Sequence, residues 1–103
     1  MRTVKFSKTF AAQLLDLIDY GEWQFGQNVA DEKRRRVLSF ITNRLALNPR
    51  MKARHATLGL VVYPIRKTPF TVLYDYDAHE LRVLFIFHGH ADLDAVDPST
   101  VEW

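Results

Sequence analysis

The sequence contains no cysteine, and this absence removes several classes of site at once. A disulfide framework, a thiolate zinc site and a cysteine nucleophile are excluded, and such a chain fits a reducing compartment. There is no run of about 18 apolar residues, so the sequence predicts no membrane span. The stretch MRTVKFSKTF carries charges throughout and lacks the apolar centre of a signal peptide. We therefore expect a cytoplasmic protein.

Glycine and proline are also scarce, with four of each among 103 residues. The scattered glycines form no phosphate-binding loop. Hydrophobic residues make up 48% of the chain, which is too apolar for a disordered segment, and the length suffices for only one core. We expect a single domain over residues 1–103, and no feature of it calls for a cofactor or a metal.

Charge is small in total, a formal +2, but unevenly distributed. Residues 33–54 contain eight basic side chains and no acid, whereas residues 75–103 contain seven acids and the single base Arg82. A basic middle segment suits a nucleic acid or an acidic protein surface, and it equally suits a solvated helix face. The low net charge argues against a protein that works by clamping many phosphates.

The first half of the chain has the pattern of one strand and two helices. Residues 2–6 alternate polar and apolar, and Ser7 has the position of a helix N-cap. Residues 10–18 carry an apolar stripe at helical spacing, and Gly26 ends this first helix. A second helix is predicted from about residue 29 to residue 47, with Asn28 as its cap. Two helices joined by a few residues form an antiparallel hairpin.

The second half changes to a period of two, which predicts strands over residues 60–65, 70–77 and 81–88. The fold class is therefore α+β, in the order β-α-α-β-β-β, with an antiparallel sheet and the helical hairpin packed on one face. In the last strand, strict alternation places one set of side chains on one face: Leu81, Val83, Phe85 and Phe87. The other face then carries Arg82, Leu84, Ile86 and His88.

That last strand is apolar on both faces over its middle, so its second face needs a cover. Two covers fit the sequence. One is a partner protein, and the other is the C-terminal tail with its apolar side chains Leu93, Val96, Val101 and Trp103.

A dispersed set of basic side chains is the best candidate for catalysis. A ribonuclease that works by 2′-hydroxyl attack needs a base, an acid and cations near the developing phosphorane charge. The residues that supply these groups are Arg54, His55, Arg66, Arg82 and His88. Two weaker candidates are the pair Asp75 and Asp77 as general acid and base, and the segment His88-Gly89-His90-Ala91-Asp92 as metal ligands. For both of these, ordinary strand-end residues are the simpler interpretation.

Three segments in order carry a resemblance that spans nearly the whole chain. They are FSKTFAAQLLDLIDY after the first strand, ADEKRRRVLSFITNRLALNPR in the second helix, and TVLYDYDAHELRVLFIFHGHADLD at the end. Together they resemble the ParE branch of the ParE/RelE toxin superfamily. In ParE-like proteins a basic residue often stands where this chain has Ala91. The chain also has no tyrosine after Tyr76, and its tail is acidic and interrupted by Pro98.

The resemblance implies the toxin of a type II toxin–antitoxin pair, in a hetero-oligomer with a ParD-like antitoxin whose C-terminal segment wraps the toxin. ParE-like toxins inhibit DNA gyrase, whereas RelE-like relatives cleave mRNA on the ribosome. The missing tyrosine and the acidic tail favour gyrase inhibition by binding rather than catalysis. The alternative is a ribosome-dependent, metal-independent endoribonuclease that uses Arg54, Arg66, Arg82 and His88. A third possibility, kept open by Ala91, is an inactive binding module.

Two surfaces follow from this hypothesis. The target-binding residues are predicted to be the basic helix and linker, namely Lys33, Arg34, Arg35, Arg36, Arg50, Lys52 and Arg54. The antitoxin is predicted to supply a helix to the hairpin and a strand to the sheet. Its contacts are predicted to be Trp23, Phe25, Leu84 and Ile86. Alternatively, Trp23 and Phe25 pack on the end of the sheet.

Overall fold

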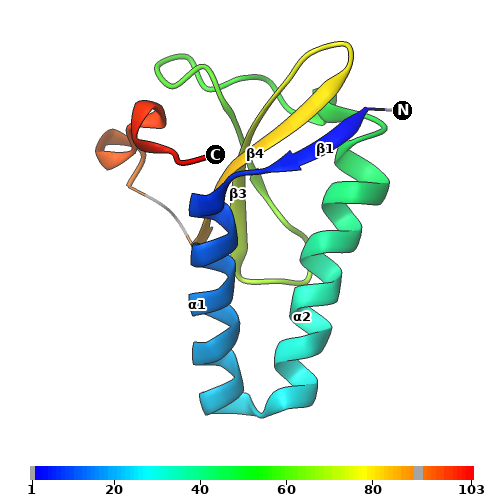
Figure 1. Cartoon of the computed structure of the whole chain (residues 1–103), viewed down its shortest axis with the longest axis vertical. Helices are drawn as coiled ribbons and strands as arrows, with labels where there is room; N and C mark the ends of the chain where they lie inside the picture. The colour runs from blue at the N-terminus through cyan, green and yellow to red at the C-terminus, as the bar shows by residue number, and fades with distance from the viewer. Residues whose placement is uncertain (1, 90–91) are drawn as a thin grey trace.

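A helical hairpin packs on one face of a four-stranded sheet and extends beyond the sheet at its turn (Figure 1). The computed structural model describes residues 2–89 and 92–103. Within these residues no helix has the length and apolar content needed to cross a membrane. The elements are β1 (Thr3–Phe6), α1 (Lys8–Phe25), α2 (Gln27–Phe40), β2 (Val61–Pro64), β3 (Phe70–Tyr76) and β4 (Glu80–His88), with short 3-10 turns at Pro49–Met51, Leu93–Ala95 and Pro98–Thr100.

The strand order is β1-β4-β3-β2, and the α+β class predicted from the sequence is confirmed. The sheet is mixed rather than wholly antiparallel, because β1 pairs with β4 in parallel. Short connections make β2, β3 and β4 successive antiparallel neighbours. Both helices and two strands separate β1 from β4, so no tight turn constrains the direction in which β1 joins the edge.

The alternation of β4 is broken by a β-bulge. Leu73 of β3 lies opposite Phe85, but the next residue, Tyr74, lies opposite Val83, so Leu84 is an extra residue without a partner in the register. The predicted face assignment is therefore correct as far as Leu84 and wrong from Phe85 onward. Past a one-residue insertion, every side chain changes to the other face of the sheet.

As a result of the bulge, Ile86 joins Leu81 and Val83 in the core beneath the helices. Phe85 and Leu84 belong to a second cluster on the opposite face. The tail covers this second cluster through three half-buried apolar side chains, Leu93, Val96 and Val101. The cover of the second face is thus the tail itself.

Backbone contacts hold the end of the tail beside the start of α1. The Lys8 amide donates to the Glu102 carbonyl at 2.7 Å, and the Glu102 amide donates to the Thr9 hydroxyl at 2.9 Å. Trp103, which was also expected to cover the sheet, instead lies 5.2 Å from the Lys5 ammonium and is 41% exposed.

Side chains of α1 complete the edge of β4 beyond the point where β1 ends. Ser7 is the N-cap of α1, as predicted, and its hydroxyl accepts from the Phe10 amide at 2.8 Å. The same hydroxyl donates to the Leu84 carbonyl at 2.6 Å. The Gln13 side-chain oxygen accepts from the Ile86 amide at 2.9 Å. Ser7 and α1 therefore supply hydrogen bonds to one edge of β4 at Leu84 and Ile86, while β3 pairs with the other edge.

Both ends of α2 differ from the sequence prediction. Gly26, with φ of +90°, turns the chain directly from α1 into α2, so Asn28 lies inside the helix and does not cap it. At the other end, Ile41–Leu45 form a π-helical turn. There the Thr42 hydroxyl bonds the Leu38 carbonyl, which is the acceptor an α-helix would give to the Thr42 amide.

Candidate functional site

The basic run at the start of α2 does not form one surface. The Lys33 ammonium lies 6.0 Å from the centre of the Phe25 ring, at the end of the hairpin. Arg34 lines a cleft between α1 and α2, where Asp19 and Asp31 also lie. Arg35 belongs to a different cavity. These neighbouring cations therefore point to different parts of the molecule.

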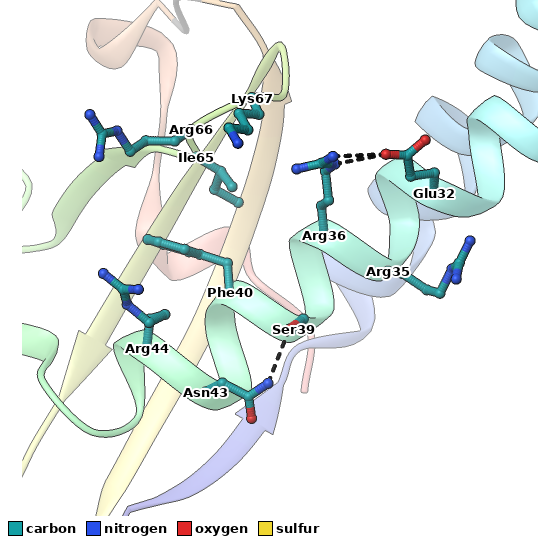
Figure 2. Close-up of a pocket in the computed structure, with 10 residues that line it drawn as sticks. All are labelled: Glu32, Arg35, Arg36, Ser39, Phe40, Asn43, Arg44, Ile65, Arg66 and Lys67. Carbon is teal, nitrogen blue, oxygen red and sulfur yellow. Dashed lines mark hydrogen bonds and ion pairs between the residues drawn. The ribbon is translucent and has the colours of Figure 1, made fainter.

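A basic groove of about 750 Å³ runs between α2 and the β2–β3 turn, residues 65–69 (Figure 2). The cations that line it are Arg35, Arg36, Arg44, Arg66 and Lys67. Arg36 pairs with Glu32 at 2.8 Å, and this hydrogen bond lowers the pKa of the Glu32 carboxyl. Among the described residues, the other four cations form no salt bridge.

The three cations predicted in the linker after the second helix, Arg50, Lys52 and Arg54, also differ from one another in their contacts. Arg50 and Lys52 are exposed and, over the described part of the chain, carry no salt bridge. Arg54 is committed to protein groups instead. It bonds the Asp75 carboxylate and donates to the carbonyls of Tyr76 at 2.9 Å and Gly59 at 3.1 Å. Arg54 therefore ties the loop after the second helix to the sheet.

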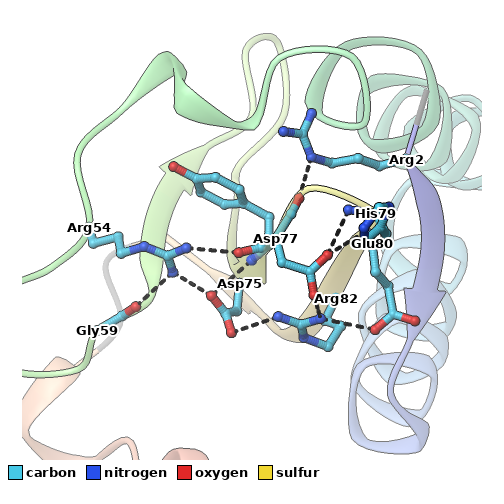
Figure 3. A network of polar contacts seen from close by, with 9 residues as sticks. Arg2, Arg54, Gly59, Asp75, Asp77, His79, Glu80 and Arg82 are labelled. Atoms are coloured by element: carbon cyan, nitrogen blue, oxygen red, sulfur yellow. Dashed lines mark hydrogen bonds and ion pairs between the residues drawn. The ribbon is translucent and has the colours of Figure 1, made fainter.

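Arg54 is one end of a polar network that also contains Arg82 (Figure 3). Arg82 donates to three carboxylates: Asp77 at 2.9 Å, Glu80 at 3.0 Å and Asp75 at 3.1 Å. Asp75 is shared by the two arginines. The guanidinium groups of Arg54 and Arg82 thus meet three carboxylates, so neither of these two arginines presents an unpaired positive charge to a phosphate. Arg2 also reaches the network, through the Asp77 carbonyl.

The ionisation of these acids follows from the contacts. Burial alone would raise the pKa of Asp75, but hydrogen bonds from Arg54 and Arg82 outweigh it and lower that pKa. The Arg82 hydrogen bond and the backbone amides of His79 and Glu80 lower the pKa of Asp77 to about 2. Both acids stay ionised at neutral pH, which makes them poor proton donors and weak bases. These contacts favour the simpler interpretation of Asp75 and Asp77 as ordinary strand-end residues.

The predicted ribonuclease residues are not brought together. Arg54 and Arg82 lie in the network, whereas Arg66 lines the basic groove. His88 is at the opposite end of β4 from Arg82, in an apolar cavity of about 210 Å³ below the hairpin turn. The His55 ring accepts from the amides of its own loop, at 3.3 Å and 3.2 Å. The sequence did not reveal that Arg54 and Arg82 are paired, because the Asp75 carboxylate that binds both arginines is 21 positions from Arg54 along the chain.

The low pKa values of Asp75 and Asp77 predict an acid-sensitive fold. A carboxyl with a pKa lower in the folded than in the unfolded chain stabilises the fold above its unfolded pKa. This stability is lost as the pH falls through the folded pKa. We expect the urea midpoint to be constant from pH 7 to about pH 5 and to fall between about pH 4 and pH 2.

The variant Asp77→Asn should have a smaller change in urea midpoint over that acid range. The matched control is Asp16→Asn, which alters an exposed acid of α1. An identical acid profile for Asp77→Asn and the unchanged protein would show that Asp77 contributes nothing to acid stability.

The predicted antitoxin contacts fall into two groups. Trp23 is 81% exposed and Phe25 is 62% exposed, so both present most of their surface to solvent, and Phe25 also lines the cavity that reaches Phe70 and His88 at the end of the sheet. Tyr20 extends this patch, with its ring centre 6.5 Å from that of Trp23. Leu84 and Ile86 are buried by the tail and by the helices respectively. Their side chains are not presented to a partner in this structure.

The candidate metal segment is only partly described. His90 and Ala91 lie outside the described residues. Among the residues that the structure covers, no group of three histidine or carboxylate side chains is placed to hold a metal ion.

Comparison with known proteins gives the family. Residues 4–93 match the family described as the ParE toxin of the type II toxin–antitoxin system, parDE. A solved structure titled "Chromosomal ParDE TA system from P. aeruginosa" has a TM-score of 0.75 and 17% identity, and the match covers 87% of this chain and 98% of that chain. No curated protein matches the sequence significantly. The chain therefore belongs to the ParE toxin family of type II toxin–antitoxin systems.

Proposed function

We propose that this ParE-type toxin inhibits DNA gyrase by binding, and that a ParD-like antitoxin neutralises it in the cytoplasm. The observation that supports binding over catalysis is the commitment of Arg54 and Arg82 to three carboxylates. An RNA-cleaving site needs its cations free to stabilise charge that develops on the phosphate. In this chain those two arginines are already satisfied.

The proposed target contacts are cations that, among the described residues, have no carboxylate partner: Lys33, Arg34 and Arg35 on α2, and Arg50 and Lys52 on the loop after it, together with Arg36 beside Glu32. Because Lys33, Arg34 and Arg35 lie on different sides of α2, the target must contact more than one side of that helix. Positive side chains on a rigid helix suit the acidic or DNA-bearing surface of a large enzyme. Arg54 contributes by fixing the loop that carries Arg50 and Lys52.

The proposed antitoxin site is the aromatic end of the hairpin. Trp23 and Phe25 present large apolar area to solvent, together with Tyr20. An amphipathic helix of an antitoxin would cover this patch by the usual mode of helix recognition. The toxin then exists as a hetero-oligomer until the antitoxin is removed.

The proposal is tested by expressing the chain alone in bacteria and following thymidine and methionine incorporation in parallel. We expect DNA synthesis to fail first while translation continues, and co-expression of the antitoxin to restore DNA synthesis. His88→Ala should remain toxic, because a broad binding surface does not depend on that side chain. Early collapse of translation, abolished by His88→Ala, would establish a ribonuclease instead.

The target surface has its own test with purified gyrase. The variant Arg50→Glu/Lys52→Glu should require about tenfold more protein for half-inhibition of supercoiling, because like charges then face the target. The matched control is Lys5→Glu/Lys8→Glu, which makes the same charge change at exposed residues outside the proposed target contacts and outside the basic groove. Equal loss in both variants would attribute the effect to net charge and reject the surface.

A further inference from the structure

We propose that the basic groove between α2 and the β2–β3 turn binds a single strand of nucleic acid, through backbone phosphates and through stacking of a base on Phe40. The proposal concerns direct binding by the isolated protein and does not depend on gyrase as the target.

The charges of the groove come from two sides of one cavity. Arg36 and Arg44 extend from the helical segment, and Arg66 and Lys67 extend from the turn opposite (Figure 2). Of these four, only Arg36 has a carboxylate partner within the described residues. A surplus of unpaired cations in a cavity of about 750 Å³ attracts a polyanion rather than a single small anion.

The spacing along the helix alternates charge with an aromatic ring. Arg36 and Phe40 are four positions apart in α2, so their Cα atoms are about 6 Å apart along the helix axis, and Arg44 follows Phe40 in the π-helical turn. A strand that follows the helix therefore meets a cation, a ring and a second cation in turn. This combination is typical of grooves that bind single strands without sequence preference.

Phe40 is held in place and still lines the groove. Its ring centre is 5.4 Å from that of Tyr63, on the sheet side, and the residue is only partly buried. An unpaired base can stack on such a ring, whereas the bases of a duplex are stacked on one another and cannot reach it. The groove should therefore prefer a single strand to a duplex.

The groups that the groove is proposed to bind are common to DNA and RNA. Its cations contact backbone phosphates, and Phe40 stacks on the face of a base, so neither contact depends on a 2′-hydroxyl. DNA and RNA strands should bind with similar affinity.

Lys67 offers a variant that separates charge from folding. Its φ of 62° lies in the left-handed region, which costs a lysine free energy and suits glycine. Lys67→Gly therefore removes a groove cation and relieves backbone strain in the same step. A loss of binding in this variant cannot be attributed to unfolding.

The experiment measures fluorescence anisotropy of labelled oligothymidylate, oligouridylate and a duplex with the purified protein at several salt concentrations. We expect both single strands to bind alike and more tightly than the duplex. The logarithm of affinity should fall with the logarithm of salt with a slope of about −2 to −3, from about 0.7 for each of three or four phosphates. Arg44→Gln/Lys67→Gly should lower affinity about tenfold or more and reduce the slope by about 1.4.

Two comparisons make the result specific. Lys5→Gln/Lys8→Gln removes the same number of cations at exposed positions outside the groove and outside the proposed target contacts, and it should change affinity little. Phe40→Leu should lower affinity about fivefold or more without changing the salt slope, because it removes stacking and no charge. Since Phe40 packs against the core, the melting temperature of Phe40→Leu is measured alongside.

Several results would overturn the proposal. They are absence of single-strand binding, equal affinity for the duplex, and equal weakening by the control cations. Displacement by polyglutamate together with no effect of Phe40→Leu in a folded variant would instead indicate an acidic protein segment. Gyrase inhibition is measured separately, so failure of the groove proposal and failure of the gyrase proposal can be distinguished.

Discussion

Replacing Trp23 and Phe25 together with alanine is expected to weaken binding of the ParD-like antitoxin about 100-fold. This factor corresponds to about 2.7 kcal/mol. Large aromatic side chains dominate the binding energy of protein interfaces when they become fully covered. Trp23 and Phe25 are exposed in the free chain, so a partner that covers them removes their apolar area from water.

The same double variant should leave the fold unchanged. Exposed side chains away from caps and cores change the free energy of unfolding by about 0.5 kcal/mol or less. The matched control is Leu47→Ala, since Leu47 is also largely exposed, at 61%, but follows the π-helical turn rather than the hairpin turn. Titration calorimetry with the antitoxin checks the affinities, and thermal denaturation checks the fold. Equal affinity of the double variant and Leu47→Ala would reject the hairpin end as the antitoxin site.

Replacing Ser7 with alanine is expected to lower the free energy of unfolding by about 2–4 kcal/mol. The loss of an N-cap costs about 1 kcal/mol. The Leu84 carbonyl at the bulge would also lose its buried hydrogen bond, which costs a further 1–3 kcal/mol or so. This is a large part of the stability of a small domain, which is typically about 5–15 kcal/mol.

Urea denaturation at neutral pH measures this loss. Ser99→Ala is the matched control, because the Ser99 amide and hydroxyl bond Asp97 at an exposed 3-10 turn. Its replacement should cost well under 1 kcal/mol. Similar losses for Ser7→Ala and Ser99→Ala would show that the bulge carbonyl does not depend on Ser7.

Local sequence patterns were sufficient to predict the helices and strands. The side chains of residues 70–76 alternate with a period of two, which predicts the strand found there. The apolar residues in 10–18 recur with the helical period, which predicts the helix found there. Ser7 was identified as a cap because capping depends on the next three residues only. The exposure of Trp23 and Phe25 was left open, because an aromatic at a helix end is compatible with both packing and exposure.

The faces of β4, the ion pairs and the basic groove depend on contacts between residues that are far apart in the sequence. One extra residue at Leu84 moved Ile86 into the helical core, and no local pattern marks that insertion. Arg54 and Arg82 share Asp75 as a partner only because the fold brings their three segments together. Arg66 and Lys67 joined Arg36 and Arg44 in one groove only because the β2–β3 turn packs beside α2.

The sequence by itself thus determined which segments become helix or strand and which side chains are charged, since these depend on neighbours along the chain. The tertiary structure decided which charges are neutralised and which remain available, because electrostatic energy depends on distance in space rather than separation in sequence.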